Sequence, residues 1–234
     1  MQIAENILLL SWLFLLPGEA SSETDISLMD RTLSQCMQNY EKLTDYTCLL
    51  TLKELIGDHY RVENELLFKF KKEQHFYFKL TGGFRSGTQV VFVKGKNDGK
   101  LLVRLASVLK FIRLRIDPTR SLVMSNSRHP LDEADIGHVL GIINDNYRKA
   151  RKNNEGRMTY AGEDSLEGRK VMVFNAEFPK DKGYYGKKIQ ISIDKELYLP
   201  TKIIVYGWDD ELLETYAYTQ CRFNSGLTEK DFEL

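Results

Sequence analysis

The chain has 234 residues, of which 42% are hydrophobic and 28% are charged, and its formal net charge is zero. This balance is typical of a globular protein that can bury a sizeable core, and it excludes a disordered chain. A neutral chain of this kind also does not indicate nucleic-acid binding.

The first twenty residues are predicted to be a signal peptide. Residues 7–16 read "ILLLSWLFLL", an apolar run that suits a signal-peptide core and is shorter than the roughly 20 residues of a membrane-spanning helix. Gly18 and Ala20 occupy the two positions that a signal peptidase reads, so cleavage after Ala20 is expected. No Lys or Arg precedes the run, which leaves an uncleaved anchor as the alternative. The remainder, residues 21–234, is expected to be a single periplasmic or otherwise exported domain.

A helix is predicted over residues 25–43. Its apolar residues recur every three or four positions and form one stripe, made of Met29, Leu33, Cys36, Tyr40 and Leu43. Such a helix must lie against an apolar surface.

From Tyr46 onward the hydrophobic period changes to that of a β-strand. In "ELLFKFKK" (65–72), Phe68 and Phe70 share one face and the lysines the other, and "HFYFKL" (75–80) alternates in the same way. Residues 89–105 contain two strands around Asn97-Asp98-Gly99, a turn whose residues tolerate positive φ. A further strand is predicted over 107–116. The lysines and arginines of "FKFKK" and "LKFIRLR" are interpreted as a solvated convex face rather than a nucleic-acid surface, with contact to anionic membrane lipid as a weaker option.

A second helix is predicted after residue 131. Its apolar positions have helical spacing and are Leu131, Ile136, Val139, Leu140, Ile143, Tyr147 and Ala150. Asp132 is the expected N-cap, with Leu131 and Ile136 as a hydrophobic staple around it. Gly137 and Gly141 each weaken the helix by about 1 kcal/mol relative to alanine, which indicates a packing or mobility reason for them.

Five more strand-like segments follow, between residues 157 and 223. The order is therefore helix, five or six strands, helix and five strands, joined by short turns that favour antiparallel pairing. The predicted fold class is α+β, mainly β. We expect one strongly curved antiparallel sheet, with the N-terminal and the central helix covering its concave side.

Three cysteines, Cys36, Cys48 and Cys221, fall in the expected mature domain. Their spacings match no zinc motif, and an odd number leaves at least one thiol unpaired. Cys36 lies on the helical stripe and is interpreted as a buried thiol. If one disulfide forms, Cys48 with Cys221 is the expected pair, because both lie in strand-like segments.

Several strings resemble a known protein family. They are "DYTCLLTLKE", "VKGKNDGKLLV", "SNSRHPLDEADIGHVL", "DKELYLPTKIIVYGW" and "NSGLTEKDFE". Together they are similar to a bacterial envelope family of unknown function, grouped with the outer-membrane lipoprotein carrier (LolA-like) superfamily. The resemblance runs from about residue 28 to 232. It implies an unclosed half-barrel of about eleven strands, with helices over its mouth and a cavity for acyl chains. It implies no reaction and no cofactor.

The string "RHP" at residues 128–130 is the most unusual local motif. Pro130 favours an extended His129, so the motif can act as a structural joint between sheet and helix. The alternatives are a polar gate beside a ligand mouth or, least favoured, a catalytic base. His129 and His138 are nine residues apart, which matches no metal-ligand spacing, so no metal site is predicted. In the superfamily an arginine inside the barrel holds the covering helices shut, and the resemblance makes Arg128 the candidate for a comparable part.

The aromatic strand faces form either a solid core or the wall of an apolar cavity. The candidate wall positions are Leu66, Phe68, Phe70, Phe76, Phe78, Val91 and Val93. An open cavity indicates a non-enzymatic envelope protein that binds a lipid or lipoprotein acyl chain. A filled one indicates a module or sensor that binds an envelope protein partner. Both interpretations stay open at this point, because fold does not fix function.

Overall fold

A computed structural model describes residues 21–82, 85–106, 111–118, 127–130 and 133–234. Two α-helices, α1 (Glu23–Glu41) and α3 (Ile136–Asn153), and two 3-10 turns, η1 (Asn97–Gly99) and η4 (Glu229–Phe232), lie in this part of the chain. The strands before α3 are β1 (Asp45–Ile56), β2 (His59–Lys71), β3 (His75–Leu80), β4 (Gln89–Val93), β5 (Leu101–Arg104) and β6 (Arg113–Ile116). Those after it are β7 (Arg157–Leu166), β8 (Arg169–Glu177), β9 (Lys188–Asp194), β10 (Pro200–Tyr206) and β11 (Leu212–Phe223).

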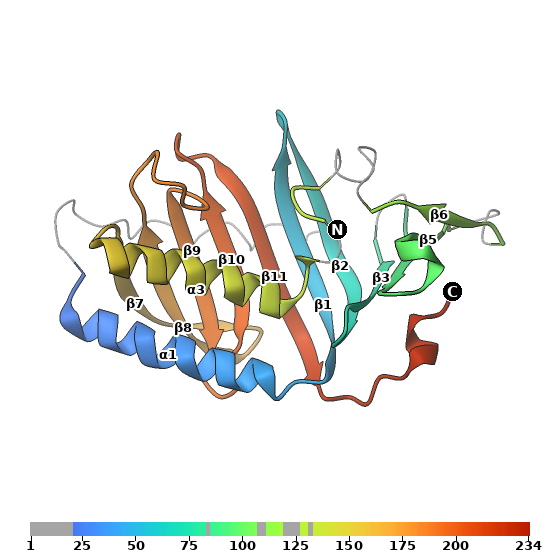
Figure 1. Ribbon diagram of the computed structural model, residues 1–234, viewed down its shortest axis with the longest axis horizontal. Helices are drawn as coiled ribbons and strands as arrows, with labels where there is room; N and C mark the ends of the chain where they lie inside the picture. The colour runs from blue at the N-terminus through green and yellow to red at the C-terminus, as the bar shows by residue number, and fades with distance from the viewer. Residues whose placement is uncertain (1–20, 83–84, 107–110, 119–126, 131–132) are drawn as a thin grey trace, which may run out of the picture.

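The described strands form one eleven-stranded sheet in the order β6-β5-β4-β3-β2-β1-β11-β10-β9-β8-β7 (Figure 1). Each pair of neighbours is antiparallel, and β1 at the centre pairs with β2 on one side and β11 on the other. The sheet is unclosed, because β6 and β7 are its two edges within the described residues. The predicted fold class is confirmed, and so is the turn at 97–99, where Asn97, Asp98 and Gly99 all have positive φ.

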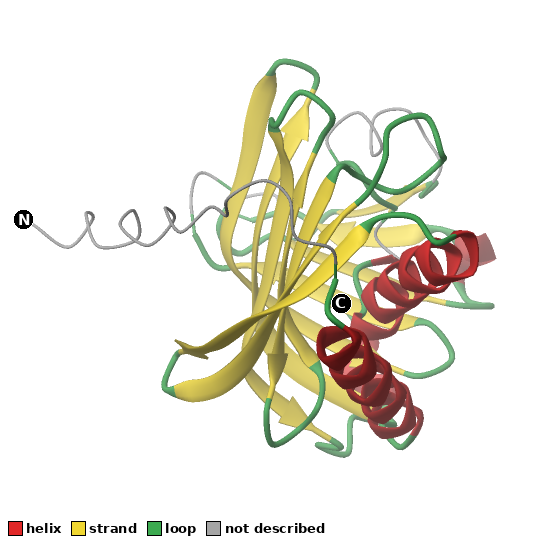
Figure 2. Cartoon of the chain, turned by 90° about the vertical axis from the view of Figure 1, so that its left-hand side faces the viewer, coloured by secondary structure: helices red, strands yellow, loops and turns green. Residues whose placement is uncertain are grey.

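The sheet is strongly curved, and both helices lie on the same side of it (Figure 2). The main core is closed between this concave face and the apolar stripes of α1 and α3. In α1 the stripe buries Met29, Leu33 and Cys36, as predicted, and Ser22 caps the helix by accepting a hydrogen bond from the amide of Asp25 (3.0 Å). None of the helices in the described residues is long and apolar enough to cross a membrane. The predicted leader, residues 1–20, lies outside the described residues.

The convex side carries a small second cluster of buried side chains. Phe232 of η4 packs there against Tyr77, Val91 and Val93. Lysines of β2 point to this side, and Lys69 binds the Asp231 carboxylate of η4 at 2.9 Å. The contact of Lys69 with Asp231 agrees with the prediction that the β2 lysines lie on the strand face opposite to Phe68 and Phe70. Of the strand predicted over 107–116, only Arg113–Ile116 is observed, and 107–110 lie outside the described residues.

Helix α3 begins three residues later than predicted. Asp135 is its N-cap, and the Asp135 carboxylate accepts a hydrogen bond from the Gly137 amide at 2.6 Å. The prediction of Asp132 as the cap is therefore wrong, and Leu131 and Asp132 themselves lie outside the described residues. Contacts with the rest of the fold set the start: the Tyr46 hydroxyl accepts from the Ile136 amide (2.9 Å), and the Tyr40 hydroxyl donates to Asp135 (2.7 Å).

The two glycines of α3 have different roles. A Cβ at Gly137 would lie 2.2 Å from the ring of Tyr40, whereas a Cβ at Gly141 would have no neighbour within 4 Å. Gly137 thus lets α1 and α3 approach each other, which supplies the packing reason predicted for it. Gly141 has no such packing reason.

Alanine at these two positions is expected to have opposite effects on stability. Gly141→Ala should raise the free energy of unfolding by about 1 kcal/mol through helix propensity. Gly137→Ala should lower it by about 1–2 kcal/mol, because the methyl group displaces Tyr40 from Asp135. Urea denaturation followed by circular dichroism measures both. Two gains of equal size would contradict the close approach of the helices.

All three cysteines are free thiols in this structure. Cys36 is buried, and burial raises the pKa of its thiol to about 12. Cys48 lies on β1 opposite a bulge in β11, where the register shifts between Thr47 and Leu49, and burial together with the neighbouring Cys221 thiol holds the pKa of Cys48 well above its usual value. The expected pair is therefore adjacent across two strands, but no disulfide joins it.

Candidate functional site

An apolar cavity of about 310 Å³ lies between the sheet and the start of α3. This volume falls at the lower end of the range of about 300–1,000 Å³ typical of ligand pockets. The apolar lining residues come mostly from β1 to β6 and from α3, and they include Leu50, Leu52, Leu66, Phe78, Leu80, Val90, Leu101, Val103, Leu105, Ile116, Val139 and Ile142.

The position of the two helices explains why this space is not filled. In the part of the chain that the structure describes, α1 packs mainly against β7, and α3 packs against α1 and β10. Both helices therefore cover the half of the sheet that follows α3 in sequence (Figure 1). Among the described residues, those that border the cavity opposite β2 to β6 are the first turns of α3, through Val139 and Ile142, and the short segment before this helix.

Two of the seven predicted wall residues, Leu66 and Phe78, line this cavity. Phe68, Phe70 and Phe76 are buried in the same core but do not border the space. Val91 and Val93 lie on the convex face, so their assignment to the wall is corrected. The register is the reason: Val90 is opposite Phe78, and Val91 is opposite Tyr77.

One side of the cavity is polar, and two buried carboxylates are part of its lining. Glu54 on β1 and Glu214 on β11 are direct partners in the sheet, and their exposed fractions are 0% and 3%. Glu54 accepts hydrogen bonds from Arg61 (3.2 Å), from the Ser127 hydroxyl (3.3 Å) and from the hydroxyl of Tyr216. Two like charges so close in a buried site require cations and donors around them.

Glu214 is bound mainly by the residues of the "RHP" string. Arg128 Nε donates to Glu214 Oε2 at 3.0 Å, and His129 Nε2 lies at the same distance from that oxygen. The Tyr185 hydroxyl donates to Glu214 Oε1 at 2.5 Å. The Arg128 amide also donates to Glu54 at 3.3 Å, so the string joins the segment before α3 to both central strands. His129 and Pro130 line the cavity as well, so the string is also part of the cavity wall.

These contacts shift the pKa values of the groups involved. Burial alone raises the pKa of Glu214, but its contacts with His129, Tyr185 and Arg128 outweigh burial and hold that pKa below its usual value. Burial lowers the pKa of His129, but the hydrogen bond and charge of Glu214 raise it above its usual value. Burial, together with the nearby charges of Glu54 and Glu214, raises the pKa of Tyr216, so its hydroxyl remains a donor.

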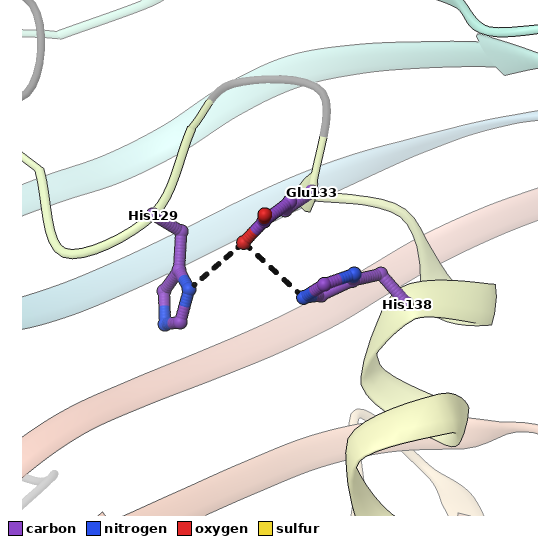
Figure 3. A group of neighbouring side chains, drawn as sticks. All are labelled: His129, Glu133 and His138. Atoms are coloured by element: carbon purple, nitrogen blue, oxygen red, sulfur yellow. Dashed lines mark hydrogen bonds and ion pairs between the residues drawn. The ribbon is translucent and has the colours of Figure 1, made fainter. Parts of the chain in front are cut away.

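His129 also belongs to a group with Glu133 and His138 (Figure 3). The Glu133 Oε2 atom lies 3.4 Å from His129 Nδ1 and 3.3 Å from His138 Nε2. One ligand atom from each residue lies within 4.8 Å of the others, and all three residues line the cavity. The nine-residue spacing of the two histidines did not indicate this group, because Glu133 and the turn into α3 bring the rings together.

Sequence reasoning also missed Glu54 and Glu214, although a signal was present. Glu54 continues the alternation of the buried residues Leu50 and Leu52, and Glu214 is in phase with the buried Tyr216 and Tyr218. A charged residue at a core-facing strand position requires a partner or a functional reason.

The string at residues 194–200 has a structural role. The Asp194 carboxylate accepts hydrogen bonds from the amides of Glu196 and Leu197, both at 2.9 Å, and pairs with Arg169. It thereby holds the turn between β9 and β10 and lies away from the cavity.

Comparisons with known proteins agree with this fold. Residues 43–234 match the model of a family described as a protein of unknown function, DUF1571. No curated protein is significantly similar in sequence. Among solved structures, the Mycobacterium tuberculosis lipoprotein LppX has a TM-score of 0.51 at 9% identity, over 88% of this chain and 99% of LppX. MucB has a TM-score of 0.50 at 13% identity, over 92% of this chain and 64% of MucB. The LolA superfamily protein NE2245 from Nitrosomonas europaea has a TM-score of 0.37 at 11% identity, over 88% of this chain and 97% of that one.

Proposed function

Because the chain belongs to the DUF1571 family and has a LolA-like fold, we propose its function from its cavity: it is a non-enzymatic exported protein that binds an acyl chain of a lipid or lipoprotein. The observation that carries this proposal is the apolar space of about 310 Å³ under the concave face of β2 to β6. A cavity with such walls is suited to a chain of methylene groups, each of which contributes about 0.8 kcal/mol when buried.

The polar side of the cavity fits the other end of such a ligand. Arg61 and Arg85 line it, and both guanidinium groups contact the Glu63 carboxylate, Arg85 at 2.6 Å. The side chain of Arg85 is mostly exposed, so it can turn toward an anionic head group without breaking buried contacts of its own. A ligand with an apolar tail and an acidic head can therefore place its tail in the cavity and its head beside Arg85.

The unfilled cavity supports lipid binding over the alternative of a protein-binding module or envelope sensor. That alternative expects a solid interior, in which aromatic side chains leave no room for a tail.

Native mass spectrometry tests the proposal on the full chain purified from the envelope of its own cells. We expect one lipid-sized adduct per chain, removable by delipidation. A homogeneous adduct-free mass under conditions that preserve a known lipid complex would contradict the proposal.

Filling the cavity is expected to weaken binding. Val103→Phe adds a ring at a buried cavity position of β5 and should weaken the binding of a fluorescent C16 fatty acid at least tenfold. The matched control is Val62→Phe, at a half-exposed position of β2 outside the lining, which should bind as the unmodified chain does. Fluorescence titration of delipidated protein measures both. Equal affinities for the two variants would place the probe outside this cavity.

A further inference from the structure

His129, Glu133 and His138 form a set of metal-ligand atoms of the kind found in zinc proteins. Two imidazole nitrogens and one carboxylate oxygen are the three protein ligands of a common open zinc site. The segment before α3 supplies His129 and Glu133, and the first turn of α3 supplies His138 (Figure 3). Their side chains point toward one another, with the Glu133 oxygen between the two rings.

The distances fit such a site closely. Zinc–nitrogen and zinc–oxygen bonds of about 2.0–2.1 Å in a tetrahedral arrangement place neighbouring ligand atoms about 3.3 Å apart. The Glu133 oxygen lies 3.4 Å from His129 Nδ1 and 3.3 Å from His138 Nε2. The two ring nitrogens lie within 4.8 Å of each other, so a modest rotation of the half-buried His138 ring completes the arrangement.

A second layer of contacts orients His129 toward this point. Metal-bound histidines typically donate their other ring nitrogen to a carboxylate, which fixes the tautomer and the ring plane. His129 Nε2 lies 3.0 Å from the buried carboxylate of Glu214 and 2.6 Å from the Tyr185 hydroxyl. With Nε2 occupied in this way, Nδ1 of the same ring faces Glu133 and is the atom available to a metal ion.

The local charge also favours a cation. The carboxylates on this side of the cavity are Glu54, Glu63, Glu133 and Glu214, and the guanidinium groups that contact them are Arg61, Arg85 and Arg128. With both imidazoles deprotonated, as metal binding requires, the four carboxylates and three guanidinium groups of the described residues leave a formal charge of −1. No net positive charge of these groups therefore repels a bound divalent cation.

We propose that His129, Glu133 and His138 bind one Zn²⁺ ion at the wall of the cavity, with water in the fourth position. This inference does not require that the cavity binds an acyl chain, because the metal site can be tested in delipidated protein. A metal ion here would link the "RHP" string to the start of α3 and so stabilise the junction between sheet and helix.

Isothermal titration of the chelator-treated full chain with zinc chloride tests the proposal. We expect one Zn²⁺ per chain, with a dissociation constant in the micromolar range or below. His138→Ala should weaken binding at least 100-fold, because it removes one of the three ligands. The His138 ring pairs with Glu133 and lies edge-on to His129, so its removal leaves the contacts of Glu214 in place. Glu133→Gln should weaken binding comparably.

His59→Ala is the matched control, because His59 is an exposed histidine at the start of β2. It should bind zinc as the unmodified chain does. Cobalt(II) gives a second readout, since a visible absorption band of four-coordinate Co²⁺ should appear in the unmodified chain and be lost in His138→Ala. Absence of stoichiometric zinc binding, or unchanged affinity in both His138→Ala and Glu133→Gln, would overturn the proposal.

Discussion

Replacing Arg128 by methionine is expected to lower the free energy of unfolding by about 3 kcal/mol. Removing one partner of a buried ion pair typically costs about 3–5 kcal/mol, because the remaining charge stays buried without its counter-charge. Glu214 is 3% exposed and lies directly opposite Glu54, so the variant leaves two carboxylates together with one cation fewer. The lower end of the range applies, since His129 and Tyr185 still contact Glu214.

Urea denaturation measures this loss, and a double variant identifies its cause. Adding Glu214→Gln to Arg128→Met removes the uncompensated charge, so the double variant should be more stable than the sum of the two single changes predicts. Lys187→Met is the control, because Lys187 pairs with the exposed Asp210 and surface pairs contribute little. A strictly additive double variant would refute the role of Arg128 as the counter-charge of Glu214.

The fold was predictable from the sequence because its local patterns agree with its tertiary contacts. The stripe of α1 buries Met29, Leu33 and Cys36, and the alternation in β2 separates Phe68 from Lys69. Short antiparallel connections then leave few ways to arrange the strands. These signals act over a few residues, which is the range that a sequence pattern reports.

The predictions that differ from the structure concern which residues of β4 lie on the concave face of the sheet and which residue caps α3. The sequence pattern offers Val91 and Val93 as cavity-wall residues, but a shift of one residue exchanges the faces of a strand, and the pairing of β4 with β3 puts Val90 on the concave face instead. Asp132 and Asp135 are both plausible caps in sequence. Two distant tyrosines select Asp135: the Tyr40 hydroxyl donates to its carboxylate, and the Tyr46 hydroxyl accepts from the amide of Ile136.

The candidate site depends on long-range contacts more than the fold does. His129 contacts Glu214, 85 residues away in sequence, and Tyr185, 56 residues away. No local spacing reports such contacts. The sequence does report that Glu54 occupies a core-facing position of its strand, and a charged residue there is the most direct sign of a buried polar network.

Phe68→Ala is expected to destabilise the protein more than Phe78→Ala, by about 4 kcal/mol against about 2 kcal/mol. The two rings stack at a centroid distance of 4.8 Å, and both are buried, at 0% and 4% exposure. Only Phe78 borders the cavity, so its ring has fewer packing neighbours on that side. Phe68 lies among the rings of Tyr46, Phe76 and Phe78, so its removal opens a new void in a packed region.

The difference between these two variants therefore reports whether the cavity exists in solution. Removal of Phe78 should cost mainly the transfer free energy of the ring, since the space beside it is already open. Removal of Phe68 adds the free energy of a new cavity to the same transfer free energy. Urea denaturation of delipidated protein measures both, and unchanged m-values would show that the unfolded states are comparable. Equal losses would mean that Phe78 is packed as tightly as Phe68, which would leave no room for an acyl chain.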